Sequence, residues 1–359
     1  MKKILVVITT AFVKVGGLTS VMMNYYRSID KTDIQIDFAS TNTIEKDLEE
    51  ELNKYNSNYY KLPKRSNTVK YLISLAKISK GYQVLHIHGN SATATIELLA
   101  GRMAKVPNRI IHIHTSHTDH PAINFLLRPL FHKLYTTPLA CSEIAGNWIF
   151  NSGNFSVLKN AINVNKYNHD ELIREKYRKE LNLENNLVFG HIGKMMNAKN
   201  HIFLIDVFKE LVKKNDKSKL VLVGDGELRR AIQEKVLKEN MNDNVIFLGM
   251  RDDIPELLQA MDIFIFPSLW EGLPLSLLEA QSTGLPCFVS SSVSEEVKMS
   301  DYTYYLPLSL SAKDWANYIL ENIPTISRYA ICEEVKENII KKKYDINIVA
   351  KDLRDIYMT

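Results

Sequence analysis

The chain has 359 residues, of which 45% are hydrophobic and 24% charged, and its formal net charge at pH 7 is +4. This composition is that of an ordinary globular protein and excludes a disordered or fibrous chain. The length exceeds what one hydrophobic core usually supports, so we expect two domains.

Cysteine spacing and apolar runs indicate the compartment. Cys141, Cys287 and Cys332 are odd in number and widely spaced, which favours reduced core residues of a cytosolic protein over a disulfide framework. The start, MKKILVVITT, is basic and then apolar like a signal peptide. Its apolar run is short and lacks a small-residue cleavage site, so we interpret it as a buried strand. No apolar run in the sequence approaches the length of a membrane span.

The first 142 residues alternate between strand and helix patterns. Apolar and alternating runs predict strands at residues 3–8, 34–40, 59–63, 83–89, 109–115 and 138–142. Helix patterns fall between these strands, at residues 19–29, 47–54, 70–80, 93–104 and 122–135. The short connections are typical of βαβ units in a parallel sheet.

Histidines lie at the ends of two of these predicted strands. His86 and His88 form one His-x-His pair, and His112 and His114 form another, with both members of a pair on one face of the strand. Four such histidines suggest a metal site, but no carboxylate or cysteine joins them at ligand spacing. We therefore predict no metal, and we expect His86 and His112 to be hydrogen-bonded core residues.

Positive charge is concentrated in the first half, where residues 1–170 hold 20 lysines and arginines against 12 acidic residues. No helix-turn-helix, zinc-finger or aromatic RNA-binding pattern is present, so we expect no nucleic acid partner. An anionic membrane surface is the better candidate. The helix at residues 122–135 is read first as a core helix, kinked at Pro129. Its alternative is a membrane-surface helix acting with nearby basic residues, namely Lys61, Lys64, Arg65, Lys70, Lys77 and Lys80.

The alternation restarts in the second half with the strand pattern LVFGHI, which is followed by Lys194 and then by Lys199. Two lysines at the mouth of a parallel strand can neutralise a diphosphate, although most lysines are simply solvated. A helix is predicted at residues 200–214. Later patterns predict strands in KLVLVGDGELR and VIFLGMRDDI, and helices at residues 170–181, 312–322 and 346–357.

The stretch from residue 263 to residue 291 organises the second half. A buried strand pattern at 263–267 leads through a loop to a helix at 274–283 and a further strand at 287–290. The loop carries Glu271 and the helix carries Glu279. Ligands of parallel sheets bind beyond the carboxyl ends of the strands, and a helix N-terminus there suits a phosphate. The alternative is that both glutamates are solvated surface residues.

The residues FPSLWEGLPLSLLEAQSTGLP resemble the Glu-x7-Glu signature of family 4 retaining glycosyltransferases. The Pro-Ser before it, the Glu-Gly pair, the Leu-Glu-Ala and the Gly-x-Pro after it also match. The resemblance implies an α/β protein of the GT-B architecture, with two Rossmann-like domains whose parallel sheets face an interdomain cleft. The resemblance spans nearly the whole chain. Within the family, the sequence is similar to enzymes of capsule and exopolysaccharide synthesis.

The resemblance also implies roles for single residues in the second domain. Glu279 would bind the ribose hydroxyls of a nucleotide, and Glu271 would hold the donor sugar and diphosphate with the backbone of Gly272, Leu273, Pro274 and Leu275. Lys199, in a Lys-Asn-His turn, fits the family pattern for the leaving diphosphate. Lys194 departs from the usual arginine and loses its two-pronged hydrogen bonding. Met250 and Arg251 would contact the base.

In the first domain the resemblance implies that Gly16 and Gly17 pack against the donor's phosphates and sugar. A plain turn is the alternative, because the full dinucleotide-binding spacing is missing. His114 would reach the donor sugar's terminal hydroxyl, with His117 as its competitor for that role. His88 would line the acceptor side.

Segments resembling the family's interdomain linker place the domain boundary near residue 165. We expect an acceptor-side domain at residues 1–165 and a nucleotide-sugar-binding domain at residues 166–344. A C-terminal helix at residues 345–359 would cross back to the first domain, or alternatively cap the second.

The predicted function is transfer of a sugar, with retention, from a nucleotide-diphosphate sugar, expected to be a UDP-sugar, to a lipid-linked or oligosaccharide acceptor. The expected location is the cytoplasmic face of the plasma membrane. No Asp-x-Asp occurs, so the resemblance implies catalysis without a metal or other cofactor. Two alternatives remain open: a nucleotide-sugar epimerase of the same architecture, and a subunit that binds the donor without transferring it.

Overall fold

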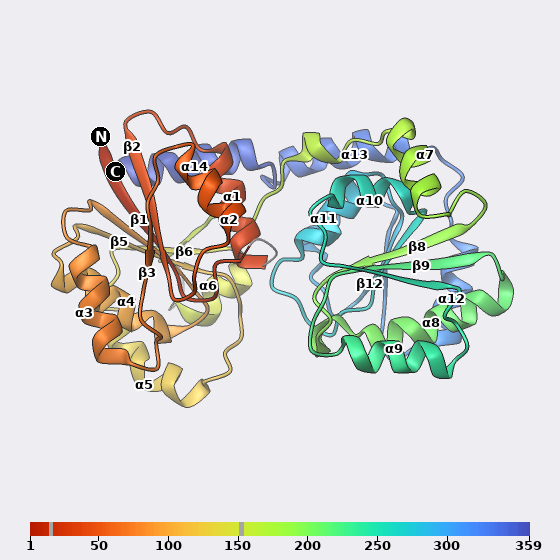
Figure 1. The fold of residues 1–359 in the computed structure, drawn as a ribbon, viewed down its shortest axis with the longest axis horizontal. Helices are drawn as coiled ribbons and strands as arrows, with labels where there is room; N and C mark the ends of the chain where they lie inside the picture. Colours follow the sequence, from red (N-terminus) through yellow and green to blue (C-terminus); the bar gives the residue numbers. More distant parts are fainter. Residues whose placement is uncertain (14–16, 151–153) are drawn as a thin grey trace. The chain divides into compact units, whose positions relative to one another are not determined.

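The computed structural model describes residues 1–13, 17–150 and 154–359. The chain forms two compact units (Figure 1). The first consists of Met1–Ala161 together with Ile346–Thr359, and the second of Ile162–Asp345. Among the described residues, no helix combines the length and the apolar character needed to cross a membrane.

The first unit is built on a parallel sheet, which has seven strands in the described part of the chain and the order β3-β2-β1-β4-β5-β6-β7. Its strands are β1 (Lys2–Ile8), β2 (Ile34–Ser40), β3 (Tyr59–Lys61), β4 (Val84–Gly89), β5 (Asn108–Ile113), β6 (Thr137–Ala140) and β7 (Ser156–Val157). The order reverses at β1, which pairs with both β2 and β4. Sites in such sheets lie at the carboxyl edge, near the reversal.

Helices cover both faces of this sheet (Figure 1). They are α1 (Gly17–Ser28), α2 (Lys46–Asn53), α3 (Thr68–Ile78), η1 (Ala92–Ala94), α4 (Thr95–Met103), α5 (Pro121–Phe131), α6 (Glu143–Ile149) and α14 (Ile346–Met358). Leu5, Leu85 and Ile111 pack in one core with residues of α3, α4 and α5. Since side chains alternate along a strand, the neighbouring residues face the other side of the sheet, where α1 and α14 pack together.

The C-terminal helix belongs to the first unit although it follows the whole second unit in sequence. On its buried side, Tyr357 forms a hydrogen bond with His86 at 2.7 Å. At its edge, Arg354 forms an ion pair with Asp30 at 3.3 Å. The amphipathic pattern of this segment is therefore explained by packing against the first sheet's layer of helices.

The second unit has a parallel sheet of six strands within the described residues, in the order β10-β9-β8-β11-β12-β13. Its strands are β8 (Leu187–Ile192), β9 (Ser218–Val223), β10 (Val245–Gly249), β11 (Ile263–Phe266), β12 (Cys287–Ser290) and β13 (Thr303–Leu306). The order reverses at β8, which pairs with β9 and β11. Both halves are thus doubly wound parallel α/β folds.

The helices of the second unit are η2 (Val164–Tyr167), α7 (Glu171–Glu180), η3 (Asn197–Lys199), α8 (His201–Lys214), α9 (Arg229–Lys238), α10 (Ile254–Ala260), α11 (Leu275–Ser282), η4 (Glu295–Val297), α12 (Ala312–Glu321) and α13 (Arg328–Lys341). One face of the sheet packs in a core with α10, α11 and α13. The other face packs with α8, α9 and α12.

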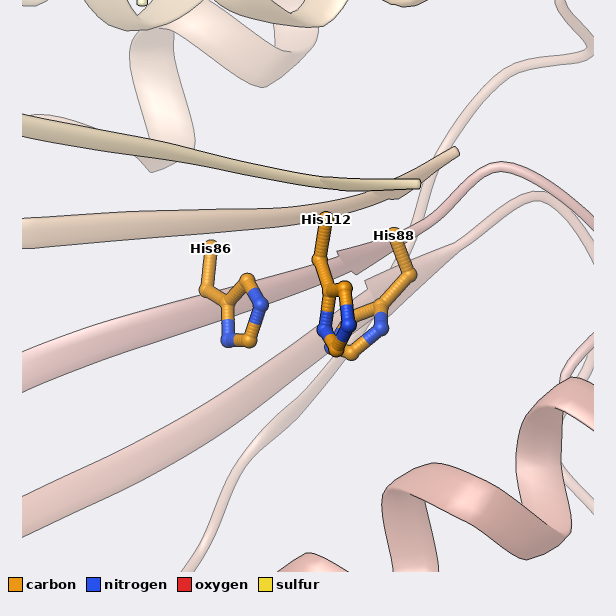
Figure 2. Close-up of side chains that lie close together, drawn as sticks. All are labelled: His86, His88 and His112. Atoms are coloured by element: carbon orange, nitrogen blue, oxygen red, sulfur yellow. The ribbon is translucent and has the colours of Figure 1, made fainter. Parts of the chain in front are cut away.

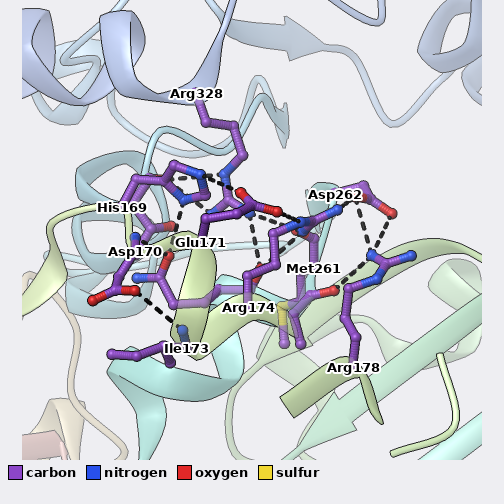
Figure 3. Close-up of polar contacts among 12 residues, drawn as sticks. His169, Asp170, Glu171, Ile173, Arg174, Arg178, Met261, Asp262 and Arg328 are labelled. Carbon is purple, nitrogen blue, oxygen red and sulfur yellow. Dashed lines mark hydrogen bonds and ion pairs between the residues drawn. The ribbon is translucent and has the colours of Figure 1, made fainter. Parts of the chain in front are cut away.

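Arginines fasten the amino edge of this second sheet (Figure 3). Asp262, just before β11, pairs with Arg174 at 2.5 Å and with Arg178 at 3.1 Å, and its carboxylate accepts from the Val188 amide at 2.8 Å. Arg328, at the start of α13, donates to the carbonyls of Leu258, Gln259, Met261 and Thr283. These contacts stabilise the amino edge of the sheet, so we look for the functional site at its carboxyl edge.

Several helices differ from the sequence-based expectation, and α6, α9 and α10 were not predicted. Helix α5 contains Pro129 in its interior and exposes Phe125 and Leu126 by 80% and 77%, so the first interpretation, a core helix, is wrong for that side of α5. Helix α13 was not predicted, because its apolar positions give no strong one-sided pattern. Its buried side chains, among them Ile331 and Val335, join the core through tertiary packing.

Candidate active site at the carboxyl edge of the second sheet

The loops after β8 and β9 pack backbone to backbone. Gly224 has φ +131°, and a Cβ on it would lie 2.1 Å from the Gly193 carbonyl oxygen. A Cβ on Gly226 would lie 2.4 Å from the carbonyl oxygen of Met195, whose own amide donates to Asp225 at 2.9 Å. Only glycine permits this close approach, so the two loops form one closely packed surface at the carboxyl edge of the sheet.

Lys199, at the end of η3, lies beside Gly193 of the loop after β8. Its Nζ is 2.8 Å from Glu271 Oε1, with 15% and 12% of the two side chains exposed, and it lies 4.8 Å from the centroid of the Phe266 ring. The Leu269 amide donates to the Ala198 carbonyl at 2.7 Å, which ties the loop after β11 to the turn that carries Lys199. The structure therefore brings together two predicted site residues that stand far apart in sequence.

A pair of buried histidines lies beside Lys199. The rings of His191 and His201 are 4.7 Å apart in an edge-to-face arrangement, and His191 Nδ1 bonds to the Ile265 carbonyl at 2.8 Å. Burial, and then the charge of Lys199, lowers the pKa of His201 to about 4. Burial also lowers the pKa of His191, so neither ring adds positive charge beside Lys199 at pH 7.

The N-terminus of α11 follows the Glu271 loop directly. The first amides of a helix have no intrahelical partner. Here Pro274 occupies the N-cap position and supplies no side-chain hydrogen bond to them. Gly272 is exposed, whereas Leu273 and Leu275 are half-buried and Pro274 is buried. A helix start with free amides next to a lysine attracts an oxyanion.

Glu279 lies one turn into α11 and is held by a residue that sequence reasoning missed. The Tyr167 hydroxyl donates to Glu279 Oε1 at 2.9 Å. Burial raises the pKa of the Glu279 carboxyl, and the hydrogen bond from Tyr167 opposes that rise. Tyr167 lies 112 positions away in the chain, and no local signal in the sequence connects it to Glu279.

The other predicted residues of this unit lie at the same edge but are differently engaged. The Lys194 side chain is 64% exposed and lies 3.7 Å from Glu227. Met250 is 47% exposed in the loop after β10, and Arg251 Nε donates to Asp253 at 2.8 Å. Gly224 and Gly226 form a Gly-Asp-Gly turn in the sequence, and this spacing of glycines indicates the close backbone packing seen here.

In the first unit, Gly16 lies outside the described residues, and Gly17 begins α1. His86, His88 and His112 are buried side by side at the carboxyl ends of β4 and β5 (Figure 2), which confirms that His86 and His112 are core residues. His114 is half-buried and bonds to His88 at 2.8 Å. His117 is exposed and lies 3.9 Å from Asp119. The predicted roles of His88, His114 and His117 toward substrates stay predictions.

The fold matches that of solved GT-B glycosyltransferase structures. Anabaena HepE, solved with UDP and glucose, superposes with a TM-score of 0.81 and 17% identity, covering 99% of each chain. The S. aureus enzyme TarM, solved with UDP, superposes with a TM-score of 0.79 and 14% identity, covering all of both chains. Likeness at this level of identity shows the fold.

Sequence comparison shows the family. Residues 173–322 match the model of glycosyl transferases group 1. The putative glycosyltransferase EpsF of Bacillus subtilis is 30% identical over 95% of this chain and 93% of its own length. An Escherichia coli UDP-Gal:alpha-D-GlcNAc-diphosphoundecaprenol alpha-1,3-galactosyltransferase is 34% identical over 62% of each chain. The chain belongs to the group 1 glycosyltransferases, and its relatives include glycosyltransferases of capsular polysaccharide biosynthesis.

Proposed function

We propose that this protein is a retaining glycosyltransferase of family 4 that transfers a sugar from a UDP-sugar to a lipid-linked or oligosaccharide acceptor in cell-surface polysaccharide synthesis. The observation that carries the proposal is the ion pair of Lys199 and Glu271, placed immediately before the free amides of α11. A diphosphate at this edge would meet a cation and a helix N-terminus together.

The chemistry of this edge supports a nucleotide-sugar donor. The half-buried Glu279 carboxylate accepts hydrogen bonds and suits the two hydroxyls of a ribose. Met250 and Arg251 follow β10, where a base would lie. The UDP in the HepE and TarM structures supports uridine as the nucleotide. The donor-binding roles that the family resemblance implies for His114, Gly16 and Gly17 stay predictions.

The proposed transfer reaction uses no metal or other cofactor. The bond between the sugar's anomeric carbon and the diphosphate oxygen breaks as the acceptor oxygen bonds to the same face of that carbon. The acceptor's proton passes to the departing diphosphate. Lys199, the α11 amides and the exposed Lys194 neutralise the charge that develops on the leaving oxygens.

The acceptor side is proposed from the first unit's surface. Helix α5 exposes Ile123, Phe125, Leu126 and Leu130. Helix α3, which like α5 packs against α4, exposes Val69 and Ile73. Exposed lysines Lys70, Lys77 and Lys133 flank these apolar residues. Apolar side chains among lysines suit an anionic membrane surface, where a lipid-linked acceptor would be found. Arg65 does not contribute, because it pairs with the buried Glu97 at 2.9 Å.

Labelled UDP-sugars incubated with purified protein and membrane lipid extract test the proposal. We expect label to enter the lipid fraction with the anomeric configuration of the donor, and the Lys199→Ala variant to lose this activity. Conversion of the donor with no acceptor present would instead identify an epimerase. Donor binding without turnover across donors and acceptors would identify a binding subunit.

A further inference from the structure

A second cluster of chemical groups lies in the first unit, on strands β4 and β5 next to His114. His88 and His112 are register partners on the adjacent strands β4 and β5, and His86 stands two residues before His88 on the same face. One ring nitrogen from each of the three lies within 4.8 Å of the others. Figure 2 shows the three rings on one side of the sheet. At most 2% of each residue is exposed.

Hydrogen bonding fixes the tautomer of His112. Its Nε2 lies 3.2 Å from the Leu158 carbonyl, which can only accept, so Nε2 carries the proton. The lone pair is therefore on Nδ1. That atom is buried and has no hydrogen-bond partner.

A chain of contacts fixes the tautomer of His88 in the same way. His114 Nδ1 donates to Asn160 Oδ1 at 3.2 Å, which leaves the lone pair of His114 on Nε2. This Nε2 lies 2.8 Å from His88 Nδ1, so His88 Nδ1 must be the donor. The lone pair of His88 consequently lies on Nε2.

His86 completes the set. Its Nδ1 lies 2.7 Å from the Tyr357 hydroxyl, whose oxygen can accept the Nδ1 proton. Its Nε2 is buried without a partner. Two orphaned ring nitrogens in one cluster are costly, since each buried unsatisfied polar atom costs about 1–3 kcal/mol.

We propose that His86, His88 and His112 bind one transition-metal ion, with Zn²⁺ as the expected occupant. Three neutral imidazoles are a ligand set typical of zinc and its neighbours. Leu158, His114 and Tyr357 each hold the second nitrogen of one ligand, as outer-shell partners do in known metal sites. Tetrahedral nitrogens at about 2.1 Å from zinc are roughly 3.4 Å apart, so small ring rotations suffice.

The role of this site is structural. Through Tyr357 it would link strands β4 and β5 to the C-terminal helix α14. No described carboxylate or cysteine joins the three histidines, so a water or hydroxide would take the fourth position, as in catalytic three-histidine zinc sites. The diphosphate residues of the second unit are not involved, and the site does not depend on the proposed function.

Elemental analysis of the untagged, full-length protein tests this site. After desalting we expect about one zinc per chain, with a nitrogen and oxygen shell near 2.0–2.1 Å in X-ray absorption. His88→Ala and His112→Ala should each lower the zinc content at least tenfold. The matched control is His120→Ala, which removes an exposed histidine of the same unit and should retain the metal.

A second measurement covers variants that fail to fold. Wild-type protein stripped of metal should gain several degrees in Tm when zinc is added, because an ion that binds only the folded state stabilises it. Wild-type protein without bound metal and without a zinc-dependent Tm would overturn the proposal. Zinc retained by both cluster variants would do the same.

Discussion

Lys199 and Glu271 form an ion pair, with Nζ 2.8 Å from Oε1, although 72 positions separate them in the chain. Glu271 comes from the loop after β11 and Lys199 from the turn after β8, and these two strands are neighbours in the sheet. The pair is mostly buried, so its charges are weakly screened. Glu271 thereby holds the lysine in place before a donor arrives.

Lys199→Ala is expected to lower kcat about 10²- to 10³-fold, the cost of removing one preorganised electrostatic stabiliser. Donor affinity should change less, because the charge on the diphosphate grows as the glycosidic bond breaks. Steady-state kinetics with varied donor measures both. Lys194→Ala is the matched control and should have a smaller effect, because Lys194 is largely exposed. A loss confined to affinity would show that Lys199 only positions the donor.

Glu279→Ala is expected to weaken nucleotide binding about ten- to a hundredfold, from the loss of about 1.5–3 kcal/mol of hydrogen bonding to a charged group. Calorimetric titration with UDP measures the affinity. Tyr167→Phe should cost less, since it removes only the hydroxyl that orients Glu279. Unchanged affinity in the Glu279 variant would remove this residue from the site.

The same residue predicts a pH dependence. Burial raises the pKa of Glu279 above its ordinary value of 4.5, and the proposed ribose contacts need the ionised form. Uridine is the suitable probe, because it keeps the ribose hydroxyls and has no phosphate that titrates near pH 6. As pH falls, its affinity should decline before an exposed glutamate would protonate. Glu279→Gln should bind weakly with no such decline. A wild-type affinity that stays constant down to pH 4.5 would contradict this reading.

Transfer should not require an added divalent metal. Activity measured with EDTA and no added metal is expected to equal activity with magnesium, because Lys199 and the α11 amides serve the leaving diphosphate. Short chelation should leave the buried histidine site loaded, and zinc analysis of the same sample checks this. Recovery of lost activity by magnesium or manganese alone would contradict the mechanism.

Arg328→Met should lower the free energy of unfolding by about 3 kcal/mol or more, because it leaves several buried carbonyls without their charged donor. The control is Arg230→Met, whose side chain is 90% exposed in a pair with Glu234 and should change stability by under about 0.5 kcal/mol. Denaturant unfolding of both variants measures the difference. Equal effects would show that the Arg328 contacts contribute little.

Replacing Phe125 and Leu126 by serine should lower binding to anionic vesicles by at least about a hundredfold, since burying each large apolar side chain contributes roughly 1.5–3 kcal/mol. Vesicle co-sedimentation measures the partition. Leu172→Ser provides the control, because Leu172 is 78% exposed on α7 of the second unit and is not part of the proposed surface. Binding that survives the double substitution would exclude α5 from membrane contact.

The alternation of strands and helices could be predicted from local signals, because apolar periodicity and turn residues depend only on neighbouring residues. It also placed the strand, loop and helix around Glu271 and Glu279, where the observed bounds of β11 and α11 differ little from the prediction. The family followed from that same stretch, whose motif is contiguous. Helix α13 was missed, since what makes it a core helix is contact with distant elements.

Which of these residues come into contact depends on how the strands are ordered in the folded sheets. Strand order cannot be predicted from local sequence. Lys199 meets Glu271 because β8 lies beside β11 in the sheet. Tyr167 meets Glu279 because η2 packs against α11. The same holds for the histidines. Two ordinary His-x-His pairs became one cluster because the register of β4 against β5 sets His88 opposite His112, and the hydrogen bonds around them aim the lone pairs.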